Sequence, residues 1–91
     1  MNNNEVIDRA VSLVKQREGI LNNVQDSYIK AIVEGVISEL ENEHDIMVDM
    51  DSMDMFMFVV DMASYRYSNR DSLEGMSKHL EYRLKTFYIQ R

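Results

Sequence analysis

The segment from Met53 to Ala63 constrains the fold most, because it is apolar almost without interruption. Only Asp54 and Asp61 are polar among its eleven residues. A helix on the surface of a globular protein carries one apolar stripe, whereas a helix that is apolar all round is usually buried on every side. We therefore predict a helix at Met53–Ser68 that occupies the centre of the fold.

A chain of 91 residues has room for one small domain, residues 1–91, which buries only a modest share of its surface. Few other elements are available to enclose the central helix. We therefore expect one face of this helix to pack in the core and another face to meet a second copy or a partner. A monomer that wraps tightly around its central helix is the alternative.

Three other segments space their apolar residues as helices do. These predicted helices are Glu5–Arg17, Ser27–Glu43 and Met76–Leu84. The chain contains no proline that would interrupt them. The predicted fold class is all-α, a small bundle of about four helices with a loop at 44–52 between the second and third helices.

The ends of these helices carry recognisable signals. Gly19 stands where a residue that ends a helix often takes positive φ, and Asp26 and Ser52 are candidate N-caps. Gly35 lies inside the second helix, where it either allows a close approach or faces outward. The tail "TFYIQ" at 86–90 is β-prone and could add to another subunit.

The charge of the chain is uneven. The formal net charge is −6, and residues 39–54 contain seven acidic residues and no Lys or Arg. Residues 62–91 contain six basic residues against three acidic ones. Either these are ordinary solvated surfaces, or unlike patches of neighbouring copies meet in a head-to-tail assembly. The candidate acidic patch comprises Glu39, Glu43, Asp49, Asp51 and Asp54.

No arrangement of residues points to catalysis, a cofactor or a metal. The absence of cysteine excludes disulfides and thiolate metal sites. Residues 49–60 only partly follow a calcium loop, because Asp54 stands at the glycine position and Val60 at the position of the bidentate glutamate. His44 and His79 have no partner histidine at metal spacing. We therefore expect neither an enzyme nor a cofactor.

Two features bear on localisation. The N-terminus lacks the basic start and apolar core of a signal peptide. The longest apolar run, Met55–Val60, is far too short to cross a membrane. We expect no membrane association and a chain that is made in the cytoplasm. An acidic chain is also a poor general binder of nucleic acid, whose affinity depends on neutralising phosphates.

The stretch "DMASYRYSNRD", residues 61–71, ends the central helix with tyrosines and arginines. Tyr and Arg are enriched at the centres of protein interfaces, so we favour a subunit contact here. Cations at a helix end also favour the helix dipole, so capping with local ion pairs is an alternative, and nucleic-acid contact is another. The candidate interface residues are Met55, Phe58, Met62, Tyr65, Arg66, Tyr67, Arg70 and Arg83.

Two motifs together suggest a family. The D-x-x-x-Y-R-Y-x-N-R-D pattern of residues 61–71 is followed by "GMSKHLEYRL" at 75–84, which ends near Tyr-Arg. This order of a helix end, a loop with glycine and a short helix resembles the small head–tail connector (adaptor) proteins of long-tailed bacteriophages and prophages. The preceding segments fit as well, so the resemblance covers roughly residues 10–88.

The resemblance implies a structural function in virion assembly. Such proteins form a ring, dodecameric in the virion, under the portal protein at the head–tail interface. The ring extends the channel through which double-stranded DNA passes without sequence readout, and it offers a platform for a stopper or tail-completion protein. The alternative function is a small intracellular helical regulator, such as an antitoxin-like or anti-repressor binding module.

Overall fold

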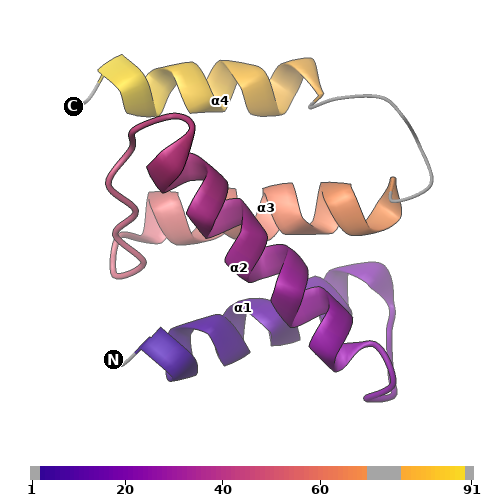
Figure 1. Cartoon of the computed structure of the whole chain (residues 1–91). Helices are drawn as coiled ribbons and strands as arrows, with labels where there is room; N and C mark the ends of the chain where they lie inside the picture. The colour runs from indigo at the N-terminus through magenta and orange to yellow at the C-terminus, as the bar shows by residue number, and fades with distance from the viewer. Residues whose placement is uncertain (1–2, 70–76, 90–91) are drawn as a thin grey trace.

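The computed structural model describes residues 3–69 and 77–89, which fold into four α-helices and contain no strand (Figure 1). The predicted all-α bundle is confirmed. The bounds of the third helix are as predicted, and the second begins and ends one residue earlier than predicted. The helices are α1 (Asn3–Glu18), α2 (Asp26–Asn42), α3 (Met53–Ser68) and α4 (Lys78–Ile89).

Helix α3 is the centre of the fold, and it packs against α1, α2 and α4. In Figure 1, α2 crosses diagonally in front of α3, while α4 runs alongside α3 in the opposite direction. Eight residues of α3 are buried: Met55, Phe56, Phe58, Val59, Val60, Met62, Ala63 and Ser64. Three helices pack against α3, but Met53 and Met57 are 60% and 36% exposed, so the expectation that another face of this helix meets a partner stays a prediction.

The other helices each contribute an apolar face to this core. On α2, Ile29, Val33, Val36 and Leu40 recur every three or four residues and are fully buried. The face of α1 comprises Val6, Ala10, Val11 and Val14, and that of α4 includes Leu80 and Leu84. Valine and alanine make up the buried face of α1, whereas that of α2 also contains the larger Ile29 and Leu40.

The helix ends differ in part from the prediction. Gly19 follows α1 with φ of 72°, as predicted. Asp26 does not cap α2, because the N-cap position belongs to Gln25 and Asp26 instead forms an ion pair with Lys15 at 2.8 Å. Ser52 occupies the N-cap position of α3, although its side chain makes no capping hydrogen bond.

The β-prone tail is a further correction, because α4 continues as helix to Ile89. The reason is packing: Leu80, Leu84 and Phe87 follow helical spacing, and Phe87 packs against the core with its ring centroid 5.1 Å from that of Phe58. A strand at this place would have no neighbour to pair with among the described residues. Gln90 lies outside the described residues.

Gly35 faces outward from α2, since no atom lies within 4 Å of the place that a β-carbon would take. Gly35→Ala should therefore raise the free energy of unfolding by about 1 kcal/mol, because alanine loses less backbone entropy in a helix. Urea denaturation followed by circular dichroism measures the change. Gly19→Ala is the matched control with the opposite sign, because Gly19 has positive φ.

Candidate interaction site

Three of the predicted interface residues are buried, and two more form ion pairs within the chain. Met55, Phe58 and Met62 are core residues, with 5%, 0% and 2% of their surfaces exposed. They pack inside their own chain, so their assignment to an accessible subunit interface is corrected. The polar members of the set, Arg66 and Arg83, are only partly exposed and form ion pairs.

Asp61 joins three helices. Arg17 of α1 and Arg83 of α4 each donate a hydrogen bond to a different carboxylate oxygen of this α3 residue. The guanidinium of Arg83 also lies 5.3 Å from the centre of the Phe58 ring. Asp61, one of the two polar residues in the apolar segment, is thus paired with two cations at the edge of the core.

The surroundings of Asp61 favour its charged form. Burial raises the pKa of its carboxyl, but the hydrogen bonds and positive charges of Arg83 and Arg17 outweigh burial and hold the pKa below the ordinary value of 3.8. Asp61 is therefore ionised at neutral pH, and the charge is compensated within the chain.

Arg66 has its acidic partner in the same chain. Its Nη2 donates to Oε2 of Glu39, which lies on α2. His44 Nε2 lies 3.8 Å from the other carboxylate oxygen of Glu39. Arg70 lies outside the described residues. Arg66 therefore forms a local ion pair, which is the alternative to a subunit contact that the sequence analysis gave for this stretch.

Reversing the charge of Arg66 tests this pair. Arg66→Glu should lower the free energy of unfolding by about 1 kcal/mol, since it replaces a partly exposed ion pair by two neighbouring carboxylates. The double change Arg66→Glu with Glu39→Arg should restore most of the loss, as chemical denaturation can measure. If the single change leaves the stability of the monomer untouched, the acidic partner of Arg66 is not Glu39.

The two tyrosines lie near an exposed apolar patch that the sequence analysis missed. Tyr65 and Tyr67 are half-buried, and the Tyr67 ring centroid lies 6.1 Å from that of Tyr28 on α2. Beside Tyr67 the turn between α1 and α2 exposes Leu21 and Val24. We define the turn patch as Ile20, Leu21, Val24, Tyr28 and Tyr67. The available signal was two apolar residues, Leu21 and Val24, in the segment between the first two predicted helices.

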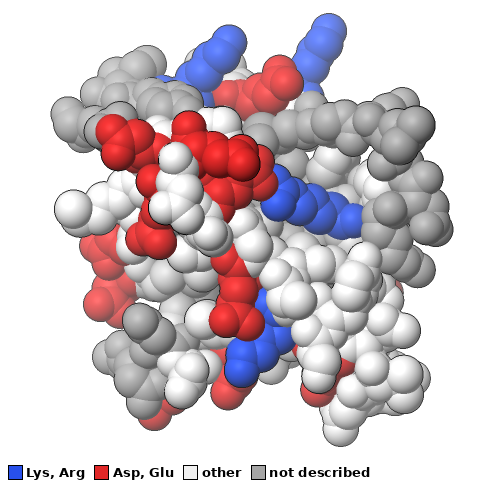
Figure 2. Space-filling model, viewed as in Figure 1, with Lys and Arg blue, Asp and Glu red and all other residues white. Residues whose placement is uncertain are grey.

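The acidic residues gather around the end of α2 and the loop that follows, where red covers the upper left of Figure 2. Glu43, Asp49, Asp51 and Asp54 are exposed, whereas Glu39 is partly covered. The ligand atoms of Glu39, Glu43 and His44 lie within 4.8 Å of one another. These are the described residues that could hold a metal ion, although the guanidinium of Arg66 on Glu39 opposes a second cation there.

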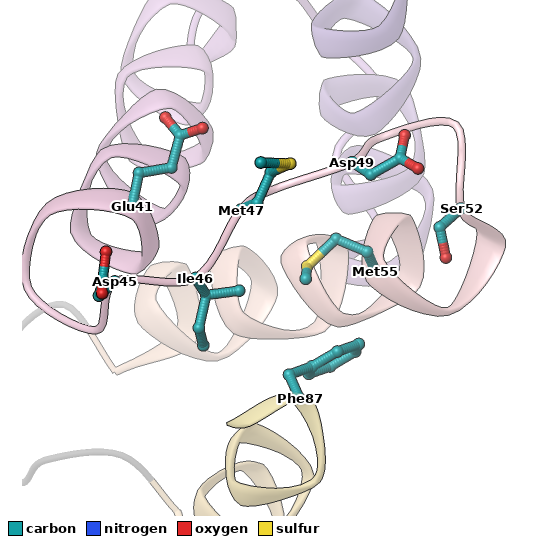
Figure 3. Close-up of a pocket in the computed structure, with 8 residues that line it drawn as sticks. All are labelled: Glu41, Asp45, Ile46, Met47, Asp49, Ser52, Met55 and Phe87. Carbon is teal, nitrogen blue, oxygen red and sulfur yellow. The ribbon is translucent and has the colours of Figure 1, made fainter. Parts of the chain in front are cut away.

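An open hollow of about 770 Å³ lies between this loop and the C-terminal part of α4. We call it the acidic hollow. Figure 3 shows Ile46, Met55 and Phe87 converging on its inner side, with carboxylates from Glu41, Asp45 and Asp49 around them. Met47 and Ser52 complete the lining. An apolar floor with an acidic rim can accept an apolar side chain from another molecule, particularly one without negative charge.

Comparison of the chain with models of known protein families, with curated proteins and with solved structures finds no match. Within the part of the chain that the structure describes, no helix is both long and apolar enough to cross a membrane.

Proposed function

We propose that this chain is a head–tail connector of a long-tailed bacteriophage or prophage. It assembles as a homo-oligomeric ring, dodecameric in the virion, docks beneath the portal protein and extends the channel for DNA. The face of the ring that points away from the portal serves as the platform for a stopper or tail-completion protein. The proposal has its origin in the resemblance of residues 61–71 and 75–84 to that family.

One observation supports the proposal beyond the sequence. Asp61 opens the first motif and Arg83 stands near the end of the second, and these two residues form an ion pair across α3 and α4. The first motif also contributes Asn69, whose Nδ2 donates to the carbonyl oxygen of Tyr65 at 2.8 Å where α3 ends. The described parts of the two motifs are therefore in contact through Asp61 and Arg83, which supports reading the two patterns together.

The distribution of charge is compatible with a DNA channel. Exposed carboxylates surround the end of α2 and the following loop (Figure 2). A basic lining would bind the phosphate backbone tightly, whereas an acidic surface lets double-stranded DNA pass without being held. An acidic lining would let DNA of any sequence pass, because it makes no contacts with the edges of the bases.

Co-sedimentation with portal-bearing capsids from the parent phage tests the proposal. The folded chain should sediment with filled capsids that carry the portal and stay in solution with capsids that lack it. Light scattering of the chain alone gives the oligomeric state before docking. Equal recovery with both kinds of capsid, or with neither, contradicts the proposal.

A small protein-binding regulator is the second candidate. The turn patch supports it, because exposed apolar patches mark protein contacts, whether with a host protein or with a further copy. The two candidates differ in their partner. A regulator binds one host protein as a monomer and ignores capsids, whereas a connector binds the portal vertex and its own neighbours.

A further inference from the structure

The turn patch contains some of the most exposed apolar residues in the described part of the chain. Leu21 is 98% exposed, Val24 82% and Tyr28 44%. Neither Leu21 nor Val24 packs against the core of its own chain. Because contiguous exposed apolar residues on a soluble protein usually mark a contact with another molecule, this turn is a candidate for the projecting half of an interface.

The acidic hollow has the complementary form. Its floor of Ile46, Met55 and Phe87 is apolar, and its volume of about 770 Å³ is ample for a leucine and a valine side chain. Met47 at its edge is 87% exposed and can adapt to an apolar partner.

These two surfaces lie at opposite corners of the molecule. In Figure 1 the turn between α1 and α2 is at the lower right, and the loop between α2 and α3 is at the upper left. A single chain therefore cannot bring the turn patch to its own acidic hollow, but a second copy can. We infer that Leu21 and Val24 of one copy occupy the acidic hollow of the next copy.

Charge opposes a symmetric contact between two hollows. The hollow is rimmed by Glu41, Asp45 and Asp49, so two hollows that faced each other would bring like charges together. A symmetric contact between two turn patches is the alternative that the experiment below distinguishes. Leu21 and Val24 carry no charge and avoid this repulsion. The contact joins unlike surfaces, so it is heterologous, and contacts of this type close into rings when the rotation between neighbours permits.

The inference rests on the proposed function, because it names the surfaces through which the ring forms. Its mode of failure is nevertheless separate. A chain that sediments with portal-bearing capsids but does not use these surfaces leaves the function standing and overturns the inference. A chain that oligomerises through the turn patch and the acidic hollow but does not bind the portal supports the inference and overturns the proposed function.

Disulfide trapping tests the contact directly, because the chain has no cysteine of its own. One variant carries Leu21→Cys and another Met47→Cys, both at exposed positions where folding should be unaffected. Mixed and oxidised at high concentration, the two variants should give a covalent heterodimer, whereas each alone stays largely monomeric. A chain with both changes should give a ladder of oligomers on a denaturing gel.

Two controls make the result specific. Ser12→Cys, on the exposed side of α1, should give no comparable crosslink with Met47→Cys. Adding Val24→Asp to the Leu21→Cys chain places a carboxylate in an acidic site and should reduce the heterodimer yield roughly tenfold. A homodimer of Leu21→Cys at equal yield, or no heterodimer above the Ser12→Cys background, overturns the inference.

Discussion

Replacing Phe58 by alanine should lower the free energy of unfolding by about 3–5 kcal/mol, the usual range for a large aromatic residue in a core. Phe58 is fully buried, its ring contacts Phe87, and the Arg83 guanidinium lies over it. A domain of this size has a total stability of about 5–10 kcal/mol, so the loss should remove much of it. Urea denaturation followed by circular dichroism measures the change.

Met57→Ala is the matched control for this substitution. Met57 precedes Phe58 on the same helix but is 36% exposed, so its truncation should cost no more than about 1 kcal/mol. The comparison also separates the two roles considered for Phe58. If Phe58→Ala leaves the monomer as stable as Met57→Ala does, Phe58 faces a partner rather than the core.

Asp61→Asn should produce the second largest loss, about 2 kcal/mol at pH 7, because it weakens two hydrogen bonds to charged groups. The loss should depend on pH. Asp61 has a pKa below its unfolded value, so its contribution is fully present above about pH 4 and disappears as the pH falls through the lowered folded pKa. The difference in stability between wild type and variant should therefore shrink in acid.

Chemical denaturation at a series of pH values from neutral to acid measures this difference. Asp51→Asn, in the exposed loop before α3, is the control and should change stability by no more than about 0.5 kcal/mol. A difference for Asp61→Asn that stays constant down to low pH would mean that its effect comes from shape or packing rather than from the carboxylate charge.

Helix positions and most of the core could be predicted from the sequence, because both depend on local spacing. The stripe of Ile29, Val33, Val36 and Leu40 defines one face of α2 without reference to the rest of the chain. The positive φ of Gly19 is equally local. The end of α4 was predicted wrongly because the β-prone residue types at 86–90 were weighed by themselves, while Phe87 packs on Phe58 from another helix.

The ion pairs could not be predicted, since each joins residues that are distant in sequence. Glu39 and Arg66 are 27 residues apart, and Arg17 and Asp61 are 44 apart. The excess of basic residues near the C-terminus was interpreted either as ordinary solvated surface or as a surface for a neighbouring copy, and Arg66 and Arg83 are paired within the chain. The distribution of charged residues along the sequence predicts which surfaces are acidic or basic, but it does not predict which residue each charged side chain pairs with.

The interface residues were misplaced for a related reason. An apolar helix in a small chain was taken as evidence for a partner, yet α1, α2 and α4 pack against α3 and eight of its residues are buried. Exposed apolar side chains also lie in the turn between α1 and α2, where Leu21 and Val24 serve no helical face. The turn patch and the acidic hollow are therefore candidate contact surfaces that the search on the central helix did not consider.

Negative-stain microscopy of filled, portal-bearing capsids incubated with the folded chain tests the connector function most directly. We expect an annular density beneath the portal at one vertex of each capsid, which is absent from capsids that have not been incubated with the chain. A chain that retains its helical circular dichroism but leaves the portal vertex bare would contradict the connector function.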